Sequence, residues 1–485
     1  MTQSVQTEVV GVPAGMVPGE WLAEGWQNWE AQLLPAVQQA VQRIIRRFLE
    51  TLDERLALVR DRGWQVEGYR RHQLVTPWGV VVVRRRLYRR GRQRVFLLDR
   101  LLGWQPGRSY TAKVTQLAAL VASQLPFRPA SELLEALGMP LSHMTVHRLV
   151  QQVGGAIAEQ QEQEAEALFG DGELPPSEER EVERLYVEAD GVWIHLQRER
   201  QKMVEVWSSI TYEGWQALTP RRPRSASPPI RYRLVEKRVF SDVAGRGTVF
   251  WQRHITALHH RYDLRSVSQW VLNGDGAAWI DVGRSYLPGQ CVRQLDRFHL
   301  ARALRRALGA LAGEAYGLCV SGRWDKTARL WQRALKAAGS DEQRRLIRDQ
   351  RRYVHGQAEA LTDYRQQLAS GPDCRSLGAM ESNGDKLIKN RMGKRGMAWT
   401  LAGAKHMTKV LQERKNGQLD RWLAVRPAPP IVVAALPHPR PASAASVLAE
   451  LETDDGHWLA ASLPVLRGPG PHGPLYHVLK DASHG

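Results

Sequence analysis

Short apolar runs alternate with helical segments through the middle of this 485-residue chain, and their order constrains the fold more than any other feature. Residues 185–190 alternate apolar and polar side chains, which predicts a strand. The segments expected after it are strands at 203–211 and 232–240, a helix at 248–262, a strand at 270–272, a helix at 277–284, a strand at 291–295 and a helix from Arg297. This is the order of a ribonuclease H-like mixed sheet, so we expect an α/β catalytic core.

Two acidic residues fall at the ends of predicted strands. Asp190 ends the first of them and Asp275 directly follows the fourth. Ligand sites of α/β sheets form at such strand ends, although an aspartate there is more often a turn or capping residue. Glu188 is the main rival of Asp190, since it lies two residues away on the same strand face. Asp242 and Asp281 are lesser rivals.

Five phrases in a fixed order carry a resemblance to a known family. They are residues 95–99 (Val-Phe-Leu-Leu-Asp), 185–190, 273–280 (Asn-Gly-Asp-Gly-Ala-Ala-Trp-Ile), 295–300 (Leu-Asp-Arg-Phe-His-Leu) and 392–407. The chain resembles the ISL-re-two family of bacterial transposases, which is related to Mutator-like elements. The resemblance extends over roughly 69–411.

The resemblance implies an Asp-Asp-Glu triad formed by Asp190, Asp275 and Glu381, with Asp296 and His299 as an accessory pair. It also implies a helical insertion at about 301–375. Asn383-Gly384-Asp385 departs from the His and Val residues of the family pattern. Glu381 also suits an ordinary first-turn helix acid, and His299 also suits a core histidine.

Three carboxylates that converge would hold two Mg²⁺ (or Mn²⁺) ions, which activate the attacking oxygen and stabilise the leaving oxygen during phosphodiester cleavage. The expected function is therefore cleavage of DNA at terminal inverted repeats, followed by strand transfer into target DNA. The alternatives are an inactive or domesticated DNA-binding protein derived from a transposase, and a general nuclease. Because both DNA ends must be held at once, we expect a homo-dimer or a higher oligomer.

The charge of the chain also points to nucleic acid. It carries 68 Lys and Arg against 50 Asp and Glu, a formal charge of +18, and such an excess suits a polyanionic partner such as double-stranded DNA. Thr76-Pro77-Trp78-Gly79 predicts the turn of a β-hairpin. Nine arginines nearly unopposed by acids accompany it, and we expect Arg84, Arg85 and Arg86 among them to contact DNA, unless they form only a solvated strand face.

A short helix at 130–137, Gly138, and a second helix capped by Ser142 predict a helix-turn-helix. A plain pair of packed helices has the same pattern. The residues that would read DNA are His143, Thr145, His147 and Arg148. A second basic set follows Glu381, and we expect it to line the DNA path unless it is a solvated helix face: Lys386, Lys389, Arg391, Lys394 and Arg395.

The expected domains are a helical region at 1–65, a basic hairpin at 66–104, a helix-turn-helix region at 105–158, a linker at 159–184, the catalytic domain at 185–415 and a Pro/Ala-rich tail at 416–485. No stretch reaches the roughly 20 apolar residues that span a bilayer, and no signal peptide is recognisable. We therefore expect a cytoplasmic, nucleoid-associated protein with no membrane partner.

Overall fold

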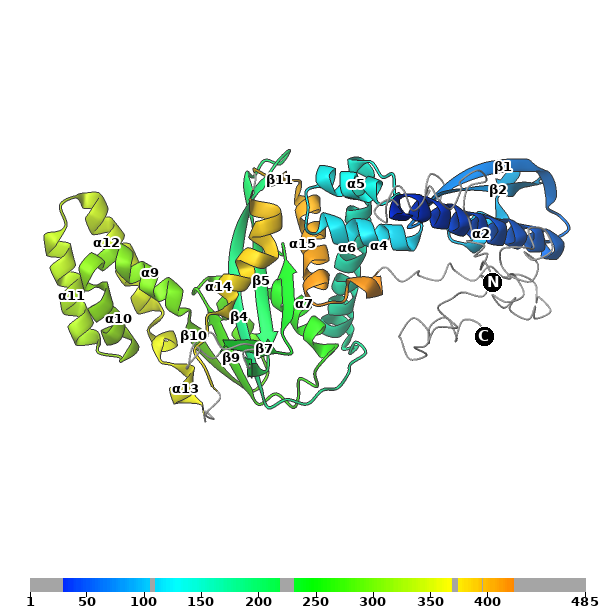
Figure 1. Ribbon diagram of the computed structural model, residues 1–485. Helices are drawn as coiled ribbons and strands as arrows, with labels where there is room; N and C mark the ends of the chain where they lie inside the picture. Colours follow the sequence, from blue (N-terminus) through cyan, green and yellow to red (C-terminus); the bar gives the residue numbers. More distant parts are fainter. Residues whose placement is uncertain (1–28, 105–109, 219–230, 369–373, 395, 423–485) are drawn as a thin grey trace, which may run out of the picture. The chain divides into compact units, whose positions relative to one another are not determined.

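The computed structural model describes residues 29–104, 110–218, 231–368, 374–394 and 396–422, apart from the side chains at 29–32, 381, 382 and 385. These residues form two compact units (Figure 1). The first contains residues 29–104, 110–114 and 134–140, and the second contains the rest. The expected features within residues 1–28 and most of the expected tail lie outside the described residues.

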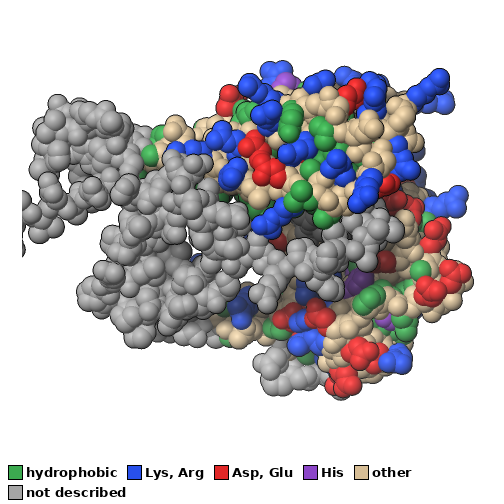
Figure 2. Space-filling view, turned by 90° about the vertical axis from the view of Figure 1, so that its right-hand side faces the viewer, with side chains coloured by type: hydrophobic (Ala, Val, Ile, Leu, Met, Phe, Trp, Pro, Cys, Tyr) green, Lys and Arg blue, Asp and Glu red, His purple; other side chains and the backbone are tan. Residues whose placement is uncertain are grey.

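The first unit is a helix packed on a β-hairpin. Helix α2 (Trp29–Val59) packs on strands β1 (Gln65–Thr76) and β2 (Gly79–Arg90), which continue into β3 (Gln93–Val95) and α3 (Leu97–Leu101). The antiparallel register pairs Thr76 with Gly79, so the predicted hairpin is confirmed. Its core consists of Leu49, Leu74, Val81, Val83 and Leu98. Lys and Arg side chains are spread over the described surface in Figure 2.

Helices α4 (Ala112–Ala122), α5 (Phe127–Ala136) and α6 (His143–Glu166) follow. The Ser142 hydroxyl accepts a hydrogen bond from the Thr145 amide at 3.1 Å, as its predicted capping role requires. The helix then continues to Glu166, followed by the π-helical turn η1 (Ala167–Asp171), so the first half of the expected linker is helical. Gln161 and Ala165 are buried, and packing together with the high helix propensity of Ala, Gln and Glu explains the extension.

The second unit is built on a mixed sheet with strand order β10-β9-β4-β5-β8. Strands β4 (Arg184–Leu196), β5 (Met203–Tyr212) and β8 (Arg238–Asp242) are antiparallel, whereas β9 (Gln269–Gly274) and β10 (Gln290–Leu295) run parallel to β4. The class is thus α/β with a mixed sheet, as expected. Strand β11 (Ala398–Trp399) pairs with the end of β4.

One predicted strand is wrong. Residues 232–240 form two strands, β7 (Arg231–Val235) and β8, because Glu236 between them has φ +48° and breaks the extended backbone. β7 pairs with β6 (Gly214–Leu218) in a separate hairpin, and only β8 joins the main sheet.

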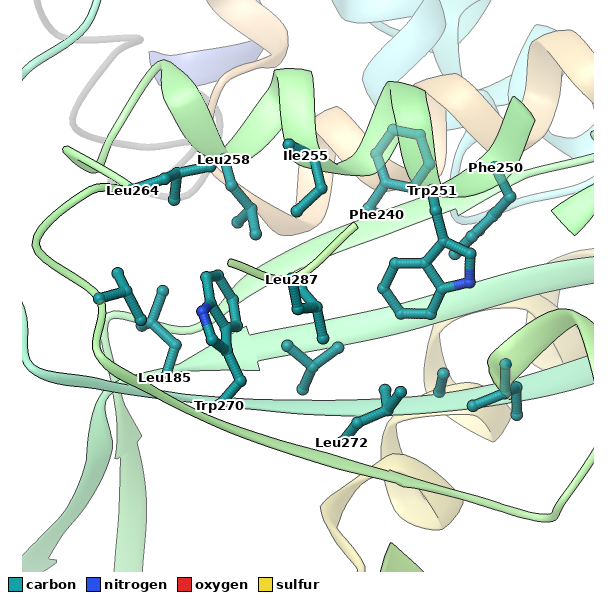
Figure 3. Close-up of a cluster of buried hydrophobic side chains, with 14 of the residues drawn as sticks. Leu185, Phe240, Phe250, Trp251, Ile255, Leu258, Leu264, Trp270, Leu272 and Leu287 are labelled. Carbon is teal, nitrogen blue, oxygen red and sulfur yellow. The ribbon is translucent and has the colours of Figure 1, made fainter. Parts of the chain in front are cut away.

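Helix α7 (Gly247–His259) covers one face of this sheet. Figure 3 shows Phe250, Trp251, Ile255 and Leu258 extending from the helix toward Trp270 and other strand residues. The short helices α8 (Ala278–Asp281) and η2 (Val282–Ser285) complete this layer. The predicted helices at 248–262 and 277–284 are confirmed in place and differ only at their ends.

Between β10 and the end of the sheet domain lies the expected helical insertion. Its helices are α9 (Arg297–Leu308), η3 (Gly309–Leu311), α10 (Ala312–Val320), α11 (Trp324–Ala337), α12 (Asp341–Gly356), η4 (Ala358–Leu361) and α13 (Tyr364–Gln367). They have a hydrophobic core of their own, which includes Leu304, Trp331 and Ile347.

The chain returns to the sheet through α14 (Ala379–Gly384) and the π-helix η5 (Asp385–Gly393), and continues through α15 (Leu401–Lys415) to η6 (Leu419–Trp422). α15 packs against α6 and β8. Among the described residues, no helix has both the length and the apolar character that crossing a membrane would demand.

Candidate active site

Asp190 and Asp275 occupy adjacent positions on neighbouring strands, but Asp190 does not end its strand as predicted, because β4 continues to Leu196. Strands β4 and β9 are parallel neighbours whose register pairs Ala189 with Gly274, and each aspartate is the next residue along its chain. Neighbouring strands lie about 4.8 Å apart. A Cβ at Gly274 would lie 2.9 Å from the Ala189 carbonyl oxygen and 2.7 Å from Ile280, so only glycine fits immediately before Asp275. Both aspartates are partly exposed.

The turn that carries Asp275 is held by the helical insertion. The Tyr353 hydroxyl, on α12, donates to the Asp275 carbonyl oxygen at 2.5 Å, and the Asp275 carboxylate accepts from the Ala277 amide at 2.8 Å. Gly276 has φ +87°, and a Cβ there would lie 2.7 Å from the Gln357 side chain. Burial and the charge of Asp275 both raise the pKa of Tyr353, which keeps its hydroxyl protonated and able to donate.

Glu188, the expected rival of Asp190, is fully buried and has a different role. One carboxylate oxygen accepts from the Tyr212 hydroxyl at 2.7 Å. The other accepts from the Asn273 side-chain amide at 3.1 Å and from the backbone amides of Gly378 at 2.9 Å and Met380 at 3.3 Å. Burial raises the pKa of Glu188 despite these bonds. The side chain therefore connects β4 to β5, to β9 and to the start of α14.

Asp296 continues this network on the third parallel strand. It directly follows β10 and caps α9, accepting from the Phe298 amide at 2.9 Å. Its other oxygen accepts from the same Asn273 amide at 3.0 Å. His299 lies partly buried in the first turn of α9, with its ring edge-on to Phe298. Asn273 thus links the carboxylates of Glu188 and Asp296 across three strands.

The lesser rivals are both engaged in ion pairs. Asp281 pairs with Arg293 at 2.7 Å. Asp242 is buried and pairs with Arg253 at 2.8 Å and with Lys409 at 3.6 Å. Burial opposes its ionisation, but the two positive charges outweigh burial and hold the pKa of Asp242 below its usual value. Both carboxylates are therefore engaged by basic side chains of the same unit.

Glu381 lies in α14, the helix whose first residues are bonded to Glu188. A Cβ on Gly384, in the same helix, would lie 3.9 Å from Val192 of β4, so α14 runs along the strand that carries Asp190. Among the side chains that the structure describes, no group of three His, Cys, Asp or Glu could hold a metal ion; the Glu381 side chain is not among them. The donor chemistry of Asp190 and Asp275 fits a hard divalent cation.

Four of the hairpin arginines pair with acids of the same unit, which corrects the expectation that they are nearly unopposed. The pairs are Arg85–Asp99, Arg86–Asp53, Arg90–Asp61 and Arg94–Glu67, all at 2.6–2.8 Å. Arg85 is only 7% exposed and bonds Asp99 through two nitrogens. It is buried away from any DNA backbone, whereas Arg84 is exposed above the Tyr69 ring.

The four residues expected to read DNA bases occupy the first turns of α6: His143, Thr145, His147 and Arg148. His143 and Arg148 are exposed. Thr145 shares a hydrogen bond with the capping Ser142, and His147 packs edge-on against Phe127, where burial lowers its pKa. One face of α6, between Val146 and Ala165, is buried by packing against α15 and neighbouring elements.

The basic residues that follow Glu381 also divide into exposed and buried ones. Lys386 and Lys394 are exposed, and Lys389 is partly exposed. Arg391 is 4% exposed, donates to the Ala122 carbonyl oxygen at 2.6 Å and packs against the Phe127 and Trp399 rings. The expectation that Arg391 lines a DNA path is therefore wrong. Arg395 lies outside the described residues.

Comparison with known proteins places the chain in a family. A family model described as "Uncharacterised protein family (UPF0236)" matches residues 20–426. The chain is similar to "UPF0236 protein in vanSb 3'region" of Streptococcus gallolyticus, with 26% identity over 407 residues that cover 81% of this chain and 83% of that protein.

This finding overturns the assignment to the ISL-re-two transposases, because the matching model spans all five phrases on which that assignment rested. Phrases such as Asn273-Gly274-Asp275-Gly276 follow strand ends and also suit ordinary turns, so they describe local conformation as much as ancestry. The chain belongs to the UPF0236 family.

Proposed function

We propose that this protein binds double-stranded DNA and cleaves it in a metal-dependent reaction, then joins the freed 3′ end to a target, as transposases do. The observation that carries the proposal is the placement of Asp190 and Asp275 one residue beyond a paired position on adjacent parallel strands, with α14 bonded beside them through Glu188. The strand order β8-β5-β4-β9-β10 supports a ribonuclease H-like core.

In this proposal Asp190, Asp275 and Glu381 would hold two divalent cations, which supply an activated oxygen nucleophile and stabilise the leaving oxygen. Asp190 and Asp275 would be the two ligands supplied by the sheet, and Glu381 the one supplied by α14. The amides of Gly191 and Ala277 donate to the two aspartates at 2.9 and 2.8 Å and fix the orientation of their carboxylates. Tyr353 holds the turn that carries Asp275, and Glu188 holds β4 beside β9 and α14.

Binding in this proposal comes from the exposed basic residues, among them Arg84, His143, Arg148, Lys386 and Lys394. Arginine and lysine neutralise phosphates, and affinity should therefore fall steeply with salt. Cleavage of two DNA ends by one assembly also implies a homo-dimer or larger.

The test is a cleavage assay on duplex DNA taken from the sequence flanking the gene, with Mg²⁺ or Mn²⁺, comparing wild type with Asp275→Asn and Asp190→Asn. The expected result is a new 3′-hydroxyl end with wild type, none with either variant, and unchanged DNA affinity. Asp325→Asn, an exposed aspartate of α11, is the matched control and should cut normally. If the wild-type protein binds DNA but never cuts it, the protein is a DNA-binding protein without this activity. If Asp275→Asn still cuts DNA, the assignment of the site is refuted.

A further inference from the structure

An exposed stripe on α9 begins beside the candidate site. The helix starts at the Asp296 cap, and its buried side consists of Leu300, Ala303, Leu304, Ala307 and Leu308. On the opposite side Phe298, Arg302, Arg305 and Arg306 are exposed. Their spacing of four, three and one residues places them on one face of a helix. We call these four residues the α9 stripe.

The exposed arginines of the α9 stripe suit the binding of an anion. Arg302, Arg305 and Arg306 form no ion pair or hydrogen bond with any residue that the structure describes, whereas Arg293 and Arg297, nearer the sheet, approach Asp281 and Asp363. Three arginines on one face repel one another unless a counter-charge lies over them. Successive turns of the helix are 5.4 Å apart, so the stripe presents its cations in a row along the helix axis.

Phe298 adds a second, independent feature. Its side chain is 46% exposed although it lies two residues from Asp296 and next to His299. An exposed aromatic ring beside a row of arginines is the arrangement by which proteins bind unpaired nucleotides, since the bases stack on the ring while the backbone follows the cations.

We propose that the α9 stripe binds the DNA strand as it leaves the candidate site, with Phe298 stacked on an unpaired base and the three arginines on the following phosphates. The inference rests on the proposed function and deepens it, because it names the strand end, rather than the intact duplex, as the ligand of this surface.

The first test measures binding of two probes by the full-length protein: a 30-base-pair blunt duplex, and the same duplex with a six-nucleotide single-stranded tail. Wild type should prefer the tailed probe by at least about fivefold, the range that one stacked base supplies. Phe298→Ala should remove this preference, Phe298→Trp should retain it, and both should bind the blunt probe as wild type does.

The second test concerns the arginines. Changing Arg302, Arg305 and Arg306 together to Ala should lower the salt dependence of tailed-probe binding by about two counterions, at roughly 0.7 for each single-strand phosphate contact. Arg329, Arg333 and Lys336 of α11, at spacings of four and three residues and also exposed, provide the matched triple-Ala control, which should bind as wild type does.

A third measurement separates this inference from the proposed function. Photocrosslinking with 5-iodouracil in the tail should join the probe to α9 at Phe298. If wild type cuts DNA but neither the α9 triple variant nor Phe298→Ala differs from the α11 control, the α9 stripe is not the binding surface although the proposed function stands. If wild type binds neither probe at low salt, both the proposed function and this inference are overturned.

Discussion

The side-chain amide of Asn273 donates a hydrogen bond of 3.1 Å to a carboxylate oxygen of Glu188. The two residues are buried on adjacent strands, and each lies two positions before one of the candidate catalytic aspartates. The same amide lies 3.0 Å from Asp296. One side chain of β9 is therefore bonded both to β4 and to the residue that follows β10. The spacing between Asp190 and Asp275 depends on residues that would touch neither metal nor DNA.

We expect Glu188→Ala to destabilise the second unit by about 3–5 kcal/mol. It leaves two buried donors, the Tyr212 hydroxyl and the Met380 amide, unsatisfied at about 1–3 kcal/mol each, and removes the bonds from Asn273 and Gly378. DNA cleavage should be lost with it. Glu188→Gln retains the shape and part of the bonding, and should lose less than half as much. Urea unfolding and the cleavage assay provide the measurements. Glu159→Ala, at an exposed position on α6, is the control; equal stability of Glu188→Ala and this control would contradict the assigned role.

Gly154 brings α6 into close contact with α15. A Cβ at this position would overlap the backbone carbonyl of His406, so Gly154→Ala should destabilise the protein by roughly 1–3 kcal/mol, as overpacking does. Gly155 is the matched control, since its Cβ would make an ordinary 3.5 Å contact with the His406 ring. Gly155→Ala should be neutral or stabilising through helix propensity. Thermal unfolding of the two variants measures the difference, and indistinguishable midpoints would refute the close contact.

His254 should make stability depend on pH. It is buried on α7, its ring bonds the Thr211 hydroxyl at 3.1 Å, and burial lowers its pKa from 6.5 to about 3. Below pH 6.5 the unfolded chain binds a proton that the folded protein does not, so stability falls as the pH is lowered from 6.5 toward 3. At pH 5 the loss is about 2 kcal/mol relative to pH 7.5.

The measurement is urea unfolding of wild type and His254→Gln at both pH values. Gln cannot titrate in this range. The variant should be less stable than wild type at pH 7.5, but its free energy of unfolding should fall by about 2 kcal/mol less on acidification. Parallel pH curves for the two proteins would show that His254 is not the group responsible.

The hairpin arginines should divide into structural and exposed groups. Arg85→Ala leaves the carboxylate of Asp99, 18% exposed, without its partner and should destabilise the first unit by about 3–5 kcal/mol. Arg71, Arg89 and Arg92 are exposed, and their triple change to Ala should leave unfolding within about 0.5 kcal/mol of wild type. It should instead reduce the salt slope of DNA binding by about two to three. A slope unchanged in the triple variant would exclude this face from DNA contact.

The order of strands and helices in the second unit could be predicted because its apolar runs are short, buried and separated by polar turns. The place of Asp275 directly after β9 followed from the same pattern, whereas Asp190, predicted to end its strand, lies inside β4, which continues to Leu196 in pairing with β5. The break at Glu236 could not be predicted, because a single residue with positive φ leaves no periodic signal. Nor could the extension of α6 past Gln160, where a Glu- and Gln-rich segment reads as a linker until its packing partners are known.

Side-chain roles were less predictable than backbone elements. Glu188 and Asp190 have the same strand face and similar chemistry in the sequence. Tertiary bonds to Glu188 distinguish them, among them those from the amides of Gly378 and Met380, 190 and 192 residues away. Arg85 and Arg391 looked like surface charge because their partners, Asp99 and the Ala122 carbonyl, are chosen by tertiary packing. Asn273 carried one available signal, its place on β9 directly before Gly274-Asp275, which strand alternation places on the same face as Glu188.

The bond between Glu188 and Gly378 has a consequence for synthesis of the chain. During translation the two aspartate-bearing strands leave the ribosome long before α14, with the whole helical insertion made in between. Until Gly378 and Met380 are synthesised, Glu188 lacks two of its hydrogen-bond donors. Glu381, the acidic residue of α14, has not been synthesised either. Under the proposed function, a nascent chain that stalls or is truncated before this point would therefore lack the third acid of the site and would be unable to cut DNA.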